Sequence, residues 1–345
     1  MHRNIQRVGA VILGIIFLSS IPFPAHGEEF YKGKIITFIV GYSAGGAFDT
    51  YTRLIARHFT KHAPGNPTTI VQNMTGAGGM IAANHLYHRA KPDGLTIGAW
   101  AAPLVLQHIL GNEAAQFDGR NFGWVGVPSP YDTVCTFNTA SGIKTPQDWF
   151  ASKRPLKISS IGPGTSTSDI PKILKVAVGF PLDVVEGYKG GADARLAVES
   201  GEVDGYCGSW QTVKAPWRAA FQSGKILPVL QATLKSHPDL KDTPLAINYA
   251  NSGEGRLLLR VADYAHGAQF PYSVSPGTPQ ERLQVLQNAF METLRDPELL
   301  AEAKKSQLEI GPTDGPTTAK NLASLYELDA GVIAKLKEIL VPKQK

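Results

Sequence analysis

The sequence predicts an α/β protein of two lobes, each a mainly parallel sheet flanked by helices. Two observations support this fold class. Strand-like and helix-like patterns alternate along the chain, and they do so in two sets separated by a proline-containing connector. Such alternation is typical of parallel α/β sheets, which bind their ligands at the carboxyl ends of the strands.

The first set begins at residue 35. Its strands are expected at 35–41, 68–72 and 95–100, and the helices that follow them in turn at 47–61, 78–90 and 103–110. A further strand around Trp124 leads into a connector with Pro128 and Pro130, which disfavour helix. The chain is predicted to cross to the second lobe near residue 131.

The second set occupies residues 132–232. Strands are expected at 132–137, 156–161, 182–186, 203–207 and 225–231, with helices at 145–152, 168–179 and 191–200. The last strand returns the chain to the first lobe, which helices 279–294, 297–306 and 317–339 complete. The first lobe is therefore predicted to be discontinuous, with residues 28–131 and 233–345, and the second to hold residues 132–232.

Residues 1–27 have the features of an export signal. Arg3 and Arg7 precede an apolar stretch over residues 8–23, and small residues just before position 28 suit cleavage after Gly27. No cysteine follows the apolar stretch, which argues against a lipoprotein anchor, and no other segment approaches about 18 apolar residues. We expect a mature protein outside the cytoplasm; an uncleaved anchor is the alternative.

The charge balance excludes some classes of partner. The net charge is +5, and removal of Arg3 and Arg7 lowers the basic count from 34 to 32 against 29 acids, which leaves +3. This is too mild to indicate nucleic acid binding, and no basic run is interleaved with aromatic residues. It favours anionic ligands slightly, through electrostatic steering.

The chain has two cysteines, Cys135 and Cys207, each in a strand-like segment. Disulfides persist outside the cytoplasm, but pairing depends on a Cα separation that the sequence does not give. A disulfide and two separate buried thiols therefore both stay open. Two cysteines are too few for a zinc site and no zinc-ligand spacing occurs, so neither a metal nor a cofactor is predicted.

Glycine-rich turns follow strands in both lobes. The first, after strand 35–41, leads into a helix whose apolar residues recur at three- and four-residue spacing. The first N–H groups of a helix have no partner within it, so this turn can hold an anion without a basic side chain. Residues 76–79 offer a second amide cluster, and residues 162–169 a loop rich in hydroxyl donors. Plain chain reversal and helix capping remain the alternatives.

Several motifs in order resemble the Bug family, the periplasmic solute-binding proteins of tripartite tricarboxylate transporters. They are the strand and A-G-G-x-x-D turn of residues 40–49, N-x-x-G-A-G-G at 73–79, P-D-G at 92–94 and the tyrosine-glycine loop at 185–191. The resemblance covers the whole mature chain. It implies a flytrap-like periplasmic-binding-protein fold that closes on a small carboxylate and delivers it to the membrane components of the transporter. No enzymatic activity is expected, and the protein is expected to be a monomer.

The predicted ligand site combines loops of both lobes. Its residues are Tyr42, Ala44, Gly45, Gly46 and Asp49 in the first loop, Ala77, Gly78 and Gly79 in the second, and Thr165, Ser166, Ser168 and Gly191 in the opposite lobe. The resemblance implies that backbone amides, hydroxyls and waters hold the carboxylate, and no glycine loop here contains arginine. Asp49 would repel an anion, so we expect it to orient waters or amides, or to cap the helix.

One position departs from the family pattern. Relatives carry a G-x-G-T-x-x-H type sequence, and Ser168 stands where the histidine is usual. Any ligand contact of that histidine is therefore in doubt, and dicarboxylates, tricarboxylates, aromatic carboxylates and uncharged amides all stay open. Lys189 is either a ligand cation or a solvated side chain.

Two other functions compete with transport. Residues 41–45 fit G-x-S-x-G, which would make Ser43 the nucleophile of an exported serine hydrolase. However, the motif follows the first strand, where such enzymes normally have several strands before it, and none of the nine histidines lies in a loop that marks it as the base. A binding protein that serves a sensory receptor would share the fold.

Overall fold

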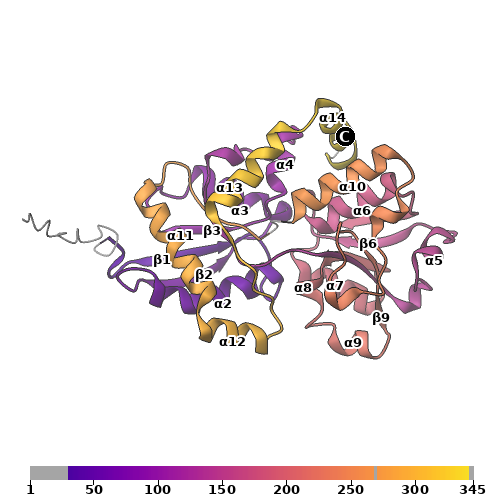
Figure 1. The fold of residues 1–345 in the computed structure, drawn as a ribbon, viewed down its shortest axis with the longest axis horizontal. Helices are drawn as coiled ribbons and strands as arrows, with labels where there is room; N and C mark the ends of the chain where they lie inside the picture. The colour runs from indigo at the N-terminus through magenta and orange to yellow at the C-terminus, as the bar shows by residue number, and fades with distance from the viewer. Residues whose placement is uncertain (1–29, 268–269, 342–345) are drawn as a thin grey trace, which may run out of the picture.

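The computed structural model describes residues 30–267 and 270–341. The predicted export signal, residues 1–27, lies outside the described residues. Two lobes lie side by side, each built on its own sheet (Figure 1). This confirms the predicted two-lobed α/β architecture.

The first sheet has six strands in the order β11-β4-β10-β3-β1-β2. They are β1 (Ile35–Val40), β2 (Thr68–Asn73), β3 (Thr96–Ala99), β4 (Gly123–Val127), β10 (Tyr272–Val274) and β11 (Thr313–Asp314). Strands β1, β2 and β3 are parallel, whereas β10 runs antiparallel to β3 and β4. In register, Val40 pairs with both Asn73 and Ala99, so the carboxyl ends of the three parallel strands are level.

The second sheet has five strands in the order β7-β6-β8-β5-β9. They are β5 (Thr133–Asn138), β6 (Leu156–Ser160), β7 (Leu182–Glu186), β8 (Gly205–Ser209) and β9 (Ile226–Gln231). Strands β6, β7 and β8 are parallel, and β5 runs antiparallel to β8 and β9. Each lobe therefore has a parallel core of three strands with antiparallel strands added beside it.

Most predicted helices lie where periodicity placed them. In the first lobe they are α2 (Ala47–His62), α3 (Met80–His88), α4 (Leu104–Ile109), α11 (Gln280–Arg295) and α12 (Pro297–Lys305). In the second they are α5 (Pro146–Phe150), α6 (Ser166–Ala177) and α7 (Gly191–Ser200). Two short helices there, α8 (Trp210–Val213) and α9 (Arg218–Gln222), were not predicted. Helix α2 buries the apolar face that the sequence indicates, which includes Tyr51, Leu54 and Phe59.

The predicted helix 317–339 is wrong as a single element. The chain forms α13 (Gly315–Ala323), a short 3-10 turn and then α14 (Ala330–Leu340). Leu328 and Asp329 have extended backbone, with ψ of 142° and 141°, and the Asp329 side chain accepts a hydrogen bond from Gly331 N–H at 2.7 Å. An aspartate at this position caps a new helix, which competes with continuation of the old one.

Helix α10 (Gly253–His266) is absent from the sequence-based prediction. Ser252 caps it by accepting from Gly255 N–H at 2.9 Å, and the two glycines in its first turn obscure the pattern. Helices α10 and α14 both pack against α6 of the second lobe (Figure 1). Part of the segment assigned to the first lobe thus contacts the second, and the lobe boundaries stay a prediction.

A disulfide joins Cys135 of β5 to Cys207 of β8. The two residues face each other in the antiparallel register of adjacent strands. The alternative of separate thiols is therefore wrong. Within the described residues, no helix has both the length and the apolar character needed to cross a bilayer.

Candidate functional site

Four loops meet at the boundary between the lobes, and each follows the carboxyl end of a parallel strand. They are residues 41–46 after β1, 74–79 after β2, 161–165 after β6 and 187–190 after β7. Ser43 N–H donates to Lys189 C=O at 3.2 Å, and Ser43 Oγ donates to Asp193 Oδ2 at 3.0 Å. The lobes are thus in direct contact through the predicted ligand-binding loops.

Two glycines permit this close approach. A Cβ on Gly190 would lie 2.1 Å from Ser43 Oγ and 3.0 Å from Ser43 N. Gly78 has φ +65°, and a Cβ there would lie 3.1 Å from Pro163 O of the opposite lobe. Larger residues would hold the lobes apart, so the glycines at 78 and 190 serve lobe closure.

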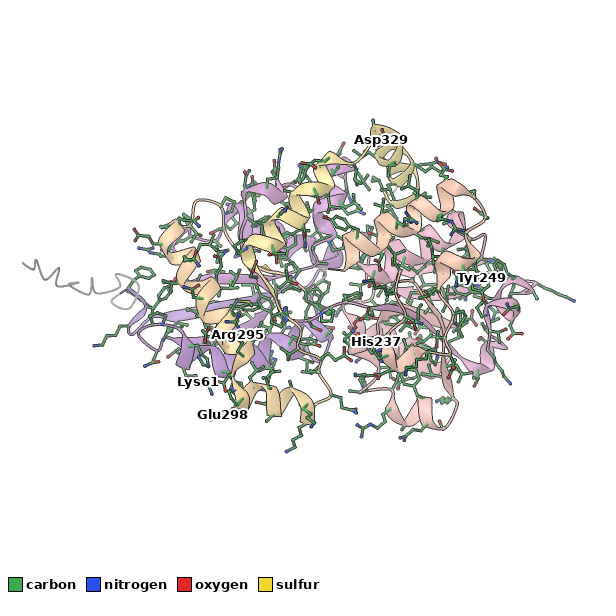
Figure 2. The ribbon with its side chains drawn as sticks, viewed as in Figure 1. Lys61, His237, Tyr249, Arg295, Glu298 and Asp329 are labelled. Atoms are coloured by element: carbon green, nitrogen blue, oxygen red, sulfur yellow. A yellow bond between two sulfur atoms is a disulfide. The ribbon has the colours of Figure 1, made fainter. Side chains whose placement is uncertain are left out.

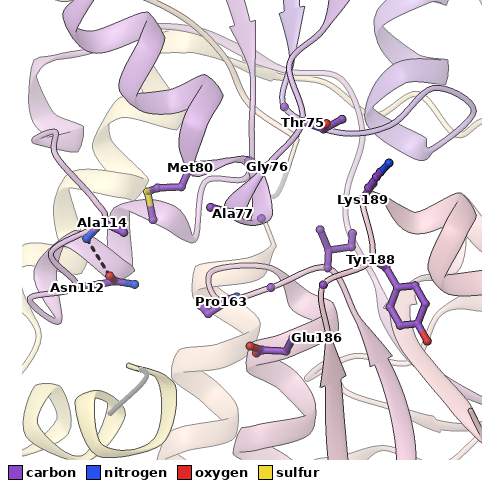
Figure 3. A pocket seen from close by; sticks show the side chains of 16 residues that line it. Thr75, Gly76, Ala77, Met80, Asn112, Ala114, Pro163, Glu186, Tyr188 and Lys189 are labelled. Atoms are coloured by element: carbon purple, nitrogen blue, oxygen red, sulfur yellow. Dashed lines mark hydrogen bonds between the residues drawn. The ribbon is translucent and has the colours of Figure 1, made fainter. Parts of the chain in front are cut away.

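A cavity of about 550 Å³ lies among these loops (Figure 3). Of the predicted site residues, Ala77, Gly78 and Gly79 line it, together with Pro163 and Ile161 from the second lobe. Lys189 and Thr75 lie on one side of it, and Glu186 lies on another. Its volume is in the range of about 300–1,000 Å³ that small-molecule sites occupy.

A smaller cavity of about 30 Å³ lies next to it, and the two share Ile161. Tyr42, Gly46, Thr165 and Gly191, all predicted, line this inner cavity. Aromatic side chains that the prediction missed form much of its wall; they are Phe48, Tyr131, Tyr206 and Phe270. Its volume matches roughly one water or one carboxylate group.

Two helix N-termini face each other across the inner cavity. Helix α2 starts after Gly46 and α7 starts after Gly190, and neither glycine provides a side-chain cap. A Cβ on Gly46 would lie 3.7 Å from Gly191 N, so the two helix starts are adjacent. Their first N–H groups have no partner within the helix and carry the positive end of the helix dipole. Together they favour an anionic group between the lobes.

Comparison with known proteins supports this interpretation of the chain. Residues 53–336 match the model of the family described as "Tripartite tricarboxylate transporter family receptor". The chain belongs to this receptor family. Among solved structures it is similar to the periplasmic binding protein BugD, with 20% identity and a TM-score of 0.74 over 90% of this chain and 100% of the other.

Two solved structures similar to this receptor contain carboxylates. MatC from Rhodopseudomonas palustris, with bound malate, is 21% identical over 89% of this chain and 99% of its own, with a TM-score of 0.70. A second R. palustris protein, with adipate, is 18% identical over 90% and 99% of the two chains, also with a TM-score of 0.70. At these identities the likeness establishes the fold, which is that of two-lobed periplasmic binding proteins.

Asp49 of the receptor shapes the first loop and lines neither cavity. Its carboxylate accepts from Gly45 N–H at 3.0 Å, Arg53 Nε at 2.9 Å and Asn73 Nδ2 at 2.9 Å. Asn73 also donates to Tyr42 C=O at 2.9 Å, so it joins the first two loops. Burial alone would raise the pKa of Asp49, but Arg53, Gly45 and Asn73 outweigh it and hold that pKa below its ordinary value. As predicted, Asp49 orients the loop backbone.

Besides Asp49, four predicted site residues line neither of the two cavities: Ala44, Gly45, Ser166 and Ser168. Gly45 instead lines an outer hollow of about 200 Å³. Ala44 is exposed, and Ser166 Oγ hydrogen-bonds the Tyr131 hydroxyl. Ser168 Oγ donates to Glu186 Oε1 at 2.7 Å, which leaves it no direct role at either cavity. The side chain at the family's histidine position therefore bonds within the second lobe.

Asp169 anchors the loop after β6. It is fully buried on α6 and accepts from Gly164 N–H at 3.0 Å. Burial raises its pKa to about 7, although Gly164 and the Lys172 charge act in the opposite direction. His266 of α10 lies 3.7 Å from its second oxygen.

Arg195 is the main residue that sequence reasoning missed. It lies on α7, is 8% exposed and lines the inner cavity. The available signal was its spacing, because Gly191, Arg195 and Val198 fall on the same face of the helix and Val198 is buried. A charged residue on an apolar helix face indicates a specific role.

Ser43 has the surroundings of a contact residue and not of a hydrolase nucleophile. Among the described residues its hydroxyl donates to the Asp193 carboxylate and hydrogen-bonds no histidine. A serine nucleophile needs a base that accepts its proton and is itself oriented by a third group. The G-x-S-x-G match is thus explained by lobe contact.

Two histidine-carboxylate groups elsewhere have metal-ligating atoms close together. They are His58, Asp296 and Glu298 in the first lobe, and His237, Asp239 and Glu309. Lys61 pairs with Asp296 and Glu298, and Lys214 with Asp239 and Glu309. Figure 2 labels Lys61 and Glu298 of the first group and His237 of the second. Because each lysine bridges both carboxylates of its group, we interpret these groups as ion-pair clusters.

Proposed function

We propose that this receptor is an extracytoplasmic solute-binding protein that captures a small carboxylate between its lobes. The observation that carries the proposal is the convergence of two helix N-termini and four glycine-containing loops on the interlobe cavities. Backbone N–H groups and the Tyr206 hydroxyl supply donors, while Ile161 and the aromatic walls contact carbon; the Thr165 hydroxyl already donates to Gly162 C=O.

The malate and adipate of the two R. palustris structures support a carboxylate ligand here. Both are dicarboxylates, and the two adjoining cavities offer separate places for two anionic groups. Closure would follow from the ligand's higher affinity for the state in which the loops meet.

We further propose that the ligand passes to the membrane components of a tripartite tricarboxylate transporter, since the family is described as its receptor. We also propose a periplasmic location, a cleaved export signal and a monomeric state. Loss of carboxylate uptake on deletion of either this gene or the membrane components would support transport. Unchanged uptake with a lost transcriptional response would instead indicate a sensory role.

Thermal unfolding of the purified protein against a panel of carboxylates tests the binding function, with calorimetry on any hit. A ligand at a hundred times its dissociation constant stabilises the folded state by about 2.7 kcal/mol, which corresponds to roughly a few degrees in the midpoint for a chain of this size. A shift with one class of carboxylate would identify the ligand. Absence of any shift, together with ester hydrolysis that Ser43→Ala abolishes, would contradict the proposal and favour the hydrolase.

A further inference from the structure

Arg195 is a buried cation without a counterion. It is 8% exposed, yet among the residues that the structure describes no hydrogen bond or ion pair reaches its guanidinium. The guanidinium nitrogens still reach the surface of the cavity, but at 8% exposure the side chain has lost most of its hydration, which is unfavourable without a partner. Such a residue in a binding cavity indicates that the missing partner is an anionic ligand.

The guanidinium lies beside other unused donors. A Cβ on Gly191 would be 3.5 Å from Arg195 Nη1 and 3.3 Å from the Tyr206 hydroxyl, so these two groups approach the same point at the start of α7. Tyr206 is 4% exposed, and its hydroxyl makes no hydrogen bond with the described residues. Burial raises the pKa of Tyr206 while the Arg195 charge lowers it, which is consistent with their proximity.

The size of the inner cavity limits what reaches Arg195. About 30 Å³ accommodates one carboxylate group but not a whole solute. Because the two cavities share Ile161, we infer that the remainder of a ligand extends past it into the cavity of about 550 Å³, which residues 77–79 line. Arg195 also lines an outer hollow of about 200 Å³, but the inner cavity has the more aromatic walls, and a low-dielectric surrounding strengthens the pairing of opposite charges.

We propose that Arg195 pairs with one carboxylate of the bound solute and selects dicarboxylates, whose second carboxylate lies near residues 77–79. The inference rests on the proposed function and deepens it. Planar guanidinium and carboxylate groups match in a bidentate pair, which a lysine cannot reproduce. Arg195 is thus a specificity-determining residue that the glycine motifs do not reveal.

The test is calorimetry with adipate, malate and succinate, and with the monoamide of the tightest binder. We compare the wild-type protein with Arg195→Gln, Arg195→Lys and, as a matched control, Arg218→Gln, which removes an exposed charge from α9 of the same lobe. Arg195→Gln should weaken dicarboxylate binding by about 100-fold, Arg195→Lys by less, and Arg218→Gln hardly at all. The wild type should prefer the dicarboxylate to its monoamide by about tenfold or more, and Arg195→Gln should lose that preference.

Unliganded stability separates a ligand contact from a structural role. Because Arg195 has no partner in the protein, Arg195→Gln should leave the thermal midpoint of the unliganded protein unchanged or raise it. A lower midpoint, with equal losses for dicarboxylate and monoamide, would assign Arg195 a structural role and overturn the inference. Wild-type affinity in Arg195→Gln would also overturn it while the proposed function stands. If the wild type binds none of the carboxylates, the proposed function itself fails.

Discussion

In both lobes an aspartate holds a glycine loop by a hydrogen bond, but the charges around the two aspartates differ. In each lobe an aspartate in the first turns of a helix accepts a hydrogen bond from a loop glycine at 3.0 Å, Asp49 from Gly45 and Asp169 from Gly164. Both glycines have positive φ, of +75° and +78°. The sheets thus present equivalent loops to the boundary between the lobes.

The difference lies in what surrounds each carboxyl group. Asp49 contacts Arg53 and Asn73, so its pKa stays below the ordinary value and it remains ionised at neutral pH. Asp169 is fully buried without a directly contacting lysine or arginine, and burial raises its pKa to about 7. The first loop therefore depends on a charge, whereas the second depends on a group that titrates near neutral pH.

The largest effect is expected from the disulfide, which only the second sheet contains within the described residues. Replacing Cys135 and Cys207 together by serine should lower the free energy of unfolding by about 2–5 kcal/mol, because the bridge restricts the unfolded chain. Chemical denaturation of the oxidised protein and the double variant measures the difference. Equal stabilities would show that the second lobe does not depend on the bridge.

The two aspartates that hold the loops, Asp49 and Asp169, should respond differently to replacement by asparagine. Asp49→Asn should cost about 1.5–3 kcal/mol of stability, since it removes a charged hydrogen-bond acceptor shared by Gly45 and Arg53. Asp169→Asn at pH 7.5 should cost less or stabilise, since it removes a buried charge. Urea denaturation of both variants at one pH provides the comparison, and equal losses would contradict the distinction between the loops.

Closure depends on the absence of a side chain at residue 190. Gly190→Ala should weaken ligand binding by about 1–3 kcal/mol, because its Cβ would overlap Ser43. The fold should persist, since the φ of Gly190 is −177°, which any residue adopts. Gly253→Ala, where nothing lies within 4 Å of the new Cβ, is the control. Equal calorimetric affinities for the two variants would exclude close lobe contact in the bound state.

The pH dependence tests Asp169 directly. Its pKa is about 7 in the folded protein against an ordinary 3.8, so the folded state holds the proton more tightly. Binding of this proton adds to the free energy of unfolding by its full amount below pH 3.8, and the contribution is lost as the pH rises to about 7. Relative to Asp169→Asn, the wild type should therefore become less stable across that window. A constant difference between their unfolding free energies would show that Asp169 does not titrate there.

The smallest effect is expected at Ser43. Ser43→Ala removes one exposed hydrogen bond to Asp193, so ligand affinity should fall by about 0.5–1.5 kcal/mol at most. Asp193→Ala should have a similar effect, and the double variant should add little because both substitutions remove the same contact. A loss of many orders of magnitude in an ester hydrolysis assay would instead revive the hydrolase hypothesis.

Much of the fold was predictable because local patterns carry it. The run at 35–40 and the periodicity of α2 locate the first strand, loop and helix within one residue. Helix α10 and the break at Asp329 were not predictable from periodicity, since glycines hide the first and a cap interrupts the second. Helix boundaries that depend on one capping side chain are difficult to locate from the sequence.

The candidate site was predictable in its backbone and not in its side chains. Motif positions located the loops, and Tyr42, Gly46, Thr165 and Gly191 lie together at the inner cavity. Tyr131, Tyr206 and Phe270 come from other segments, and only the folded chain brings them to the loops. Phe48 and Arg195 follow the predicted loops directly, on α2 and α7, but the glycine motifs do not mark them. Residues 166 and 168 were expected at the ligand, but their hydroxyls are satisfied within the protein.

A crystal structure of the protein with its tightest-binding dicarboxylate tests the central claim most directly. The account predicts one carboxylate within about 2.7–3.1 Å of the Arg195 guanidinium and of the first-turn amides of α2 or α7. The other carboxylate should lie near residues 77–79. A ligand bound outside the four loops, or one whose carboxylates contact neither Arg195 nor a helix N-terminus, would contradict it.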